Sequence, residues 1–258
     1  SCPYRFYISR ILKANIVPKY TWHMKVGTYI HLVLENAIKN NSLDFEESKK
    51  QFLESDDGQN LNEEQLFYID KMTKDIKPMV EHIKNQFPQL NTVGFEQEFN
   101  IDLKEGFILK GFIDKVMEDK NGGKYIVDYK TGNAVYDTKD IEHGFEMQNL
   151  IYTKVFKDEE IVGVYRQKIK PRFLREEKDF EKDFRLNGYT FIDRYDKSIP
   201  AEQLGYSTRN KKEFNEDEFK FTMEIVNNNI DNAIDKILST PKQCNGDSIN
   251  NICNCRSI

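Results

Sequence analysis

The chain has 258 residues, and its 38 Lys and Arg against 43 Asp and Glu give a formal net charge of -5, which does not indicate a nucleic-acid binder. Its 18 Phe and 13 Tyr favour a packed core, because disordered chains are poor in aromatic residues. No apolar run approaches the roughly 20 residues of a membrane span, and no secretory leader is visible. The composition therefore excludes a membrane protein, and we expect a cytoplasmic one.

The first third of the sequence reads as helical. Apolar spacing predicts helices over 4–12, 27–40, 45–52 and 62–87. Asn62 with Gln65 three residues later is a typical N-cap pattern for the last of these. Pro78 is expected to kink or split that helix, because proline lacks a backbone donor.

The pattern then changes to the alternation of strands. Strands are predicted over 93–103, 107–117 and 124–129, and later over 160–169 and 184–192. Gly122 and Gly123 provide a permissive turn between the second and third strands. Helices are predicted over 141–156 and 216–238, followed by an irregular tail from Thr240. Hairpin strands are antiparallel, whereas a strand reached through a helix can run parallel, so the expected fold is α/β with a mixed sheet.

Local basic clusters qualify the acidic net charge. They comprise Arg166, Lys168, Lys170, Arg172, Arg175, Lys178 and Lys182, and then Arg209, Lys211 and Lys212. Such clusters fit either a surface for phosphates or ordinary solvated faces, and the sequence leaves both readings open.

The strongest candidate for chemistry lies on two consecutive predicted strands. Asp128 and Lys130 project from one face of their strand because side chains alternate, and Asp114 on the preceding strand can point to that face. Two carboxylates offer the hard oxygen ligands that Mg²⁺ prefers, and a lysine can activate the attacking water and stabilise phosphate charge. An ordinary surface ion pair is the alternative reading of the Asp-x-Lys pattern taken alone.

Companion residues strengthen this reading. His31 and Glu35 share a helix face four residues apart, and Gln148 and Tyr152 share a face in the same way. On the strand before Asp114, Glu96 and Glu98 share a face, and either could support a metal site. Glu35 and Glu98 are the weakest of these candidates.

In combination, these patterns resemble a known family. The array G-x-x-x-H-x-x-L-E, G-F-I-D, I-V-D-Y-K-T-G and Q-x-x-x-Y, in this order, is similar to the RecB-type branch of the PD-(D/E)XK nuclease superfamily. Cys2-Pro3-Tyr4-Arg5-Phe6-Tyr7 and Gly163-Val164-Tyr165-Arg166 also resemble the nuclease domain of AddB subunits of AddAB helicase-nucleases. The likeness covers nearly the whole chain and is specific only when its pieces occur together.

The resemblance implies a restriction-endonuclease-like core that hydrolyses DNA phosphodiesters with Mg²⁺ or Mn²⁺, within an AddB-like helicase-nuclease of DNA repair and recombination. It implies His31, Asp114 and Asp128 as metal ligands, Lys130 as the catalytic lysine, and Gln148 and Tyr152 as catalytic support. DNA and a helicase-nuclease partner subunit are the implied partners. No G-x-x-x-x-G-K-[ST] loop occurs, so an ATPase motor is not expected in this segment.

The four cysteines lie near the two ends of the sequence. The resemblance implies a [4Fe-4S] cluster held by Cys2, Cys244, Cys253 and Cys255. The late spacing C-x8-C-x-C departs from the C-x-x-C-x5-C of the family, so an insertion, a last ligand beyond the sequence or a degenerate site without a cluster are all open. Zinc and four unconnected thiols are further alternatives. Iron, sulfide and visible absorbance after anaerobic purification would decide.

These observations predict one nuclease domain over 1–258. It comprises a helical part over 1–90, an α/β catalytic core over 91–192 and a closing helix with the cysteine tail over 193–258. Because the sequence opens without Met and stops just after Cys255, we expect a segment of a longer polypeptide. A stand-alone phage or CRISPR-associated exonuclease, a nuclease acting on RNA or branched DNA, and a catalytically inactive DNA-binding module remain alternatives.

Overall fold

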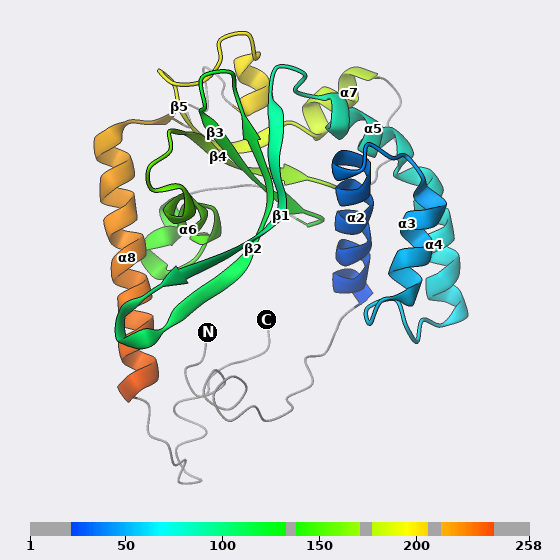
Figure 1. Cartoon of the computed structure of the whole chain (residues 1–258), viewed down its shortest axis with the longest axis horizontal. Coiled ribbons are helices and arrows are strands. Elements are labelled where there is room, and N and C mark those ends of the chain that lie inside the picture. The colour runs from blue at the N-terminus through cyan, green and yellow to red at the C-terminus, as the bar shows by residue number, and fades with distance from the viewer. Residues whose placement is uncertain (1–21, 133–137, 171–176, 206–212, 240–258) are drawn as a thin grey trace.

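The computed structural model describes residues 22–132, 138–170, 177–205 and 213–239, and places helices on both faces of a mixed β-sheet (Figure 1). The helices that precede the sheet in the chain are α2 (Trp22–Lys39), α3 (Phe45–Glu54), α4 (Glu63–Asp75) and α5 (Lys77–Asn85). Those that follow its first three strands are α6 (Gln148–Thr153), α7 (Glu177–Asp183) and α8 (Glu216–Ser239), and short 3₁₀ turns include η3 (Thr138–His143) and η4 (Lys154–Phe156).

Within the described ranges six strands form one sheet in chain order. They are β1 (Asn91–Asp102), β2 (Ile108–Glu118), β3 (Lys124–Lys130), β4 (Ile161–Lys168), β5 (Leu186–Phe191) and β6 (Glu213–Phe214). The first three strands pair antiparallel, and β4 joins β3 in parallel after the α6 crossover. The mixed sheet flanked by helices is the predicted fold class, which the structure confirms.

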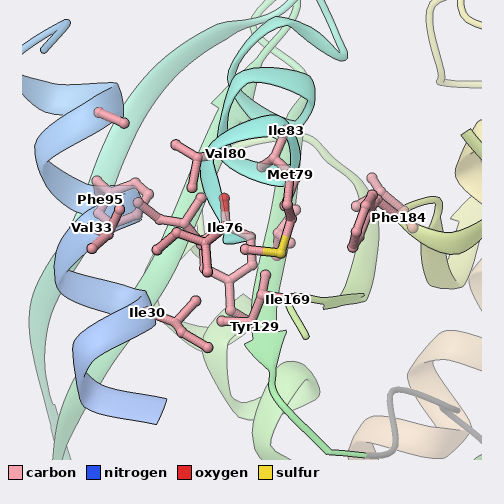
Figure 2. Packing of buried hydrophobic residues seen from close by; sticks show 14 of the residues in the cluster. Ile30, Val33, Ile76, Met79, Val80, Ile83, Phe95, Tyr129, Ile169 and Phe184 are labelled. Carbon is pink, nitrogen blue, oxygen red and sulfur yellow. The ribbon is translucent and has the colours of Figure 1, made fainter. Parts of the chain in front are cut away.

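Two hydrophobic cores lie on opposite faces of the sheet. Alternate residues of β3 divide between them, with Tyr125, Val127 and Tyr129 facing the helices α2 to α5 and Ile126 facing α6 and α8. Figure 2 shows the first core, where Val33 of α2 and Val80 of α5 pack around Tyr129 and its neighbours. Because both faces of β3 are covered, polar side chains on this strand are held in an enclosed setting.

The helical predictions agree with the structure in their local chemistry. Asn62 and Gln65 form a reciprocal capping box that opens α4. Pro78 lies in the first turn of α5, where its missing N–H costs nothing, so the predicted split of the 62–87 helix is confirmed. Helix α2 starts at Trp22, earlier than predicted, while the predicted helix over 4–12 and the tail from Thr240 lie outside the described residues.

One predicted element is wrong. The helix predicted over 141–156 is broken into η3, a turn, α6 and η4. Gly144 and Glu146 adopt positive φ values of 77° and 57°, a left-handed conformation that cannot continue an α-helix. The break matters for function, because it separates Glu146 from α6 and lets the helix begin at Gln148. Sequence periodicity also missed α7 and β6, the latter beyond the predicted end of the core at residue 192.

None of the helices in the described part of the chain combines the length and the apolar character required to cross a membrane.

Candidate active site

The site begins where strands β2 and β3 separate. Their ladder runs from Glu118↔Lys124 to Lys115↔Val127 and stops one residue short of Asp114. Beyond that point the backbone N–H of Tyr129 donates to the Asp114 carboxylate, Oδ2, over 2.5 Å instead of to a strand carbonyl. The fork between the strands therefore fixes the Asp114 side chain, which is buried between them.

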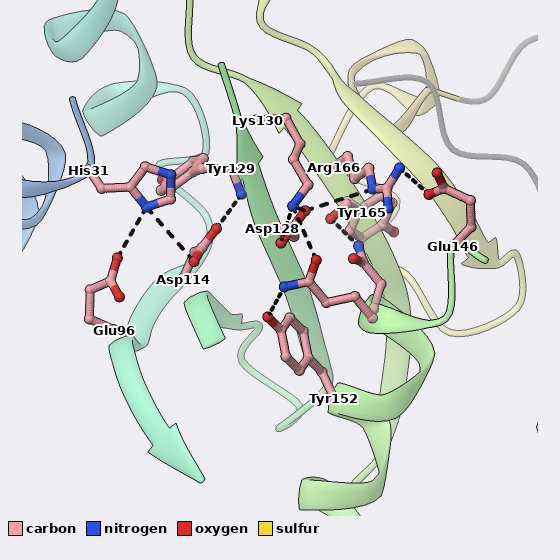
Figure 3. A network of polar contacts seen from close by, with 12 residues as sticks. His31, Glu96, Asp114, Asp128, Tyr129, Lys130, Glu146, Tyr152, Tyr165 and Arg166 are labelled. Atoms are coloured by element: carbon pink, nitrogen blue, oxygen red, sulfur yellow. Dashed lines mark hydrogen bonds and ion pairs between the residues drawn. The ribbon is translucent and has the colours of Figure 1, made fainter. Parts of the chain in front are cut away.

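A histidine and two carboxylates meet at this fork (Figure 3). Nδ1 of His31, from α2, lies 3.2 Å from Oε1 of Glu96 on β1 and 3.8 Å from Oδ1 of Asp114. One possible ligand atom from each residue falls within 4.8 Å of the others. We call His31, Glu96 and Asp114 the metal triad.

A backbone irregularity brings Glu96 into the triad. The β1–β2 register pairs Phe95 with Lys115 and Gln97 with Ile113, which places Glu96 across from Asp114. Glu96 has a φ of 45°, a costly conformation for a residue with a side chain. Phe95 packs in the core under α2, whereas Phe99 packs in the core under α6, so the strand exchanges its faces at this point.

The triad carries more negative charge than it neutralises. Burial raises the pKa of the Asp114 carboxyl to about 7, against the lowering effect of His31. Burial alone would lower the pKa of His31, but the hydrogen bond to Glu96 and the charge of Asp114 outweigh it and the pKa is raised. A divalent cation would relieve both effects, because it stabilises the ionised carboxylate and replaces the imidazole proton.

A second group surrounds Asp128, which is 1% exposed. Nζ of Lys130 lies 2.7 Å from Oδ2 of Asp128 and donates to Oε1 of Gln148 over 3.1 Å. Nε2 of Gln148 in turn donates to the Tyr152 hydroxyl over 2.6 Å. The predicted companions from α6 therefore hold the lysine in place, and we call Asp128, Lys130, Gln148 and Tyr152 the lysine network. Burial raises the pKa of Asp128, and the Lys130 ammonium opposes this effect.

Arg166 joins this network, a role that the sequence did not indicate. Its guanidinium Nε lies 3.7 Å from Oδ2 of Asp128, and Nη1 forms an ion pair with Glu146. The side chain of Arg166 is only 8% exposed, so it faces the site and does not belong to a solvated basic face. The parallel register Asp128↔Arg166 explains the contact, and a register between strands separated by a helix cannot be read from spacing.

The remaining candidates lie elsewhere. Glu35 pairs with Lys39 one turn along α2, and Glu98 is exposed on the outer part of β1, so neither belongs to the metal triad. The structure favours Glu96 over Glu98 as the supporting carboxylate. The four cysteines lie outside the described residues, and the iron–sulfur cluster stays a prediction.

The triad suits a hard divalent metal by its donor chemistry. One imidazole nitrogen and two carboxylate oxygens are ligands that Mg²⁺ and Mn²⁺ accept, and three protein ligands leave positions for water and substrate. Asp128 lies close enough to raise the pKa of Asp114 through its charge. His31, Asp114 and Asp128, the ligands expected from the sequence, thus lie around one point, with Glu96 added.

Comparison with known proteins agrees with this geometry. Residues 1–257 match the PD-(D/E)XK nuclease superfamily. The chain is 27% identical over 195 residues to an AddB-like subunit of an ATP-dependent helicase/deoxyribonuclease from Clostridium acetobutylicum, covering 62% of this chain and 17% of that protein. A Streptococcus agalactiae subunit of the same name is 23% identical over 175 residues, covering 61% of this chain and 16% of the relative. The chain thus spans about a sixth of the length of these relatives. Since the match extends over nearly every residue, the chain belongs to the PD-(D/E)XK nuclease superfamily.

Proposed function

We propose that this nuclease domain hydrolyses phosphodiester bonds of DNA with Mg²⁺ or Mn²⁺ held by His31, Glu96 and Asp114, assisted by Asp128. The observation that carries the proposal is the close approach of these three ligand-bearing side chains beside a lysine that is fixed against a buried carboxylate. A bound divalent ion at the triad would supply an acidic water and offset charge on the scissile phosphate.

The residues of the chain then divide the work of hydrolysis. The triad orients the scissile phosphate against the fork between β2 and β3. Lys130, presented by Asp128 and Gln148, donates from Nζ toward the attacking water or a phosphate oxygen. Tyr152 is buried and donates no charge; it holds Gln148, so that the lysine keeps one orientation. Water adds to phosphorus, the bond to the leaving sugar oxygen breaks, and a proton moves to that oxygen.

The finer assignments come from the relatives. Their name, which describes a subunit of an ATP-dependent helicase/deoxyribonuclease, supports DNA as the substrate and a helicase-nuclease assembly as the setting. In such an assembly the domain acts as an exonuclease in DNA repair and recombination, on a strand delivered by a motor. This chain covers only a small share of those relatives, so a helicase partner is part of the proposal.

The test is cleavage of end-labelled linear single- and double-stranded DNA with Mg²⁺ or Mn²⁺. Wild-type chain is compared with Asp128→Ala, Lys130→Ala and the matched control Lys104→Ala, whose ion pair with Asp235 lies on the surface. We expect cleavage that chelator abolishes, that both site variants lose and that the control retains. Successive shortening from one end identifies an exonuclease, and internal cuts an endonuclease.

Two results would contradict the proposal. Cleavage that persists in Lys130→Ala would place the chemistry elsewhere. Folded protein that leaves DNA intact and takes up no Mn²⁺ would indicate an inactive binding module. Protein that takes up Mn²⁺ but cleaves only RNA would keep the site and overturn the substrate.

A further inference from the structure

A groove of about 1010 Å³ opens beside the candidate site, between the start of α2, the exposed side of α4 and the ends of β3 and β4. Its lining is rich in aromatic and apolar side chains. Those used below are Trp22, Phe67, Tyr68, Met72, Lys71 and Lys170. We call this feature the aromatic groove.

The aromatic rings of the groove are unusually exposed. Phe67 and Tyr68 are 70% and 47% exposed, and the Trp22 ring meets Tyr68 edge to face with centroids 5.5 Å apart. Helix α4 buries its opposite side, through Ile69 and Met72, in the core under α2. Three rings from two helices therefore form a platform whose faces are not required for the packing of the domain.

The groove is continuous with the site. Thr131 and Gly132 line it and directly follow Lys130, while Ile30 lines it and directly precedes His31. The β3 and β4 strands are parallel and both end at the groove, where the Ile169 N–H donates to the Lys130 carbonyl. A chain lying in the groove would pass over the end of β3 to reach the lysine network.

The chemistry of the lining selects the occupant. Aromatic rings stack on unpaired bases of any sequence, and nearby ammonium groups contact the backbone phosphates. Lys71 and Lys170 provide such groups, while Glu64 and Asp75 on the α4 side keep the groove from being a general basic surface. In a duplex the bases are already stacked on one another and unavailable. From these observations and from the proposed nuclease function, on which the inference rests, we infer that the aromatic groove binds the unpaired bases of single-stranded DNA leading to the catalytic site.

The inference makes the groove a substrate-specificity element. It binds the strand away from the cleaved bond, so its residues act on substrate affinity and on the choice of single-stranded over blunt duplex DNA. The chemical step stays with the metal triad and the lysine network. Removing the rings should raise KM for single-stranded DNA and leave kcat nearly unchanged.

The chain offers a built-in reporter, because Trp22 is its single tryptophan and lines the groove. Wild-type protein in EDTA is titrated with a fluorescein-labelled thymidine oligonucleotide, and anisotropy reports binding without hydrolysis. An unlabelled oligonucleotide reports contact with the groove through quenching of Trp22. The variants are Phe67→Ala and Phe67→Ala combined with Tyr68→Ala. The matched control is Phe221→Ala on α8, a ring that is 62% exposed and outside the groove.

We expect saturable quenching, a loss of affinity of about fivefold or more for each ring removed, and no change in Phe221→Ala. Thermal melting checks that each variant is folded. Equal affinity for DNA in wild-type, groove variants and control overturns the inference, and so does DNA binding without quenching of Trp22. If the wild-type chain still cleaves DNA in that case, the nuclease proposal stands alone and the groove serves another partner. Failure of the wild-type chain both to bind and to cleave DNA removes both proposals.

Discussion

The two halves of the candidate site differ in how their charges are balanced. In the lysine network the buried Asp128 has its cations in place, with Lys130 at 2.7 Å and Arg166 at 3.7 Å. In the metal triad two carboxylates share one histidine, and burial lifts the pKa of Asp114 to about 7. One half is thus complete within the protein, while the other gains most from an external cation.

The comparison also separates stability from function. Buried charges that are paired inside the protein stabilise the fold as long as both partners remain. Buried charges without a full partner are costly, and they are retained at functional sites where a ligand completes them. Substitutions in the two halves should therefore have opposite effects on stability while both reduce cleavage.

The largest effect on cleavage is expected for Asp114→Asn. The amide oxygen can still accept from the Tyr129 N–H, so the fork between the strands persists. Loss of the charge should lower kcat by about 10²–10³-fold, because charge stabilisation at the reacting phosphate is lost. Steady-state cleavage in Mg²⁺ measures this effect. Activity within a few-fold of wild-type would show that Asp114 does not serve the metal.

Arg166→Met should have the largest effect on stability. It leaves Asp128 and Glu146 without one of their cations in a buried setting, which should cost about 3–5 kcal/mol of unfolding free energy. Urea unfolding measures this, with Lys104→Met as the control for a surface ion pair worth about 1 kcal/mol or less. Equal losses in the two variants would mean that Arg166 is not part of the site.

The pH dependence of stability should show the opposite behaviour in the triad. The pKa of Asp114 is near 3.8 in the unfolded chain and about 7 in the folded one, so the folded state binds more protons between these values. Stability in EDTA should therefore fall as pH rises from about 4 to 7. Relative to wild-type, Asp114→Asn should gain on the order of 2–4 kcal/mol by pH 8 and almost nothing near pH 4. A difference that is independent of pH would contradict the charge imbalance.

The sequence predicted the fold and most of the site for identifiable reasons. Asp128 and Lys130 share a face because strands alternate, and Gln148 and Tyr152 reach Lys130 together because they are one helical turn apart. Such relations act within one element and can be read from spacing.

The features that spacing missed depend on backbone irregularity or on distant register. Glu96 and Glu98 look equivalent in an alternating strand, and the positive φ of Glu96 separates them. Glu146 is released by a break inside a segment that reads as a continuous helix. Arg166 meets Asp128 through a parallel pairing across a helical crossover. None of the three leaves a periodic signal, and the cysteine prediction lies outside the described residues.

The most direct test of the account is calorimetric titration of Mn²⁺ into the wild-type chain and into two single variants, Glu96→Gln and Glu98→Gln, at pH 8. These residues lie two positions apart on β1, and only Glu96 belongs to the metal triad. The account predicts that Glu96→Gln weakens Mn²⁺ binding by at least about tenfold and that Glu98→Gln stays within twofold of wild-type. Equal affinities for all three proteins, or a greater loss in Glu98→Gln, would contradict the placement of the metal at His31, Glu96 and Asp114.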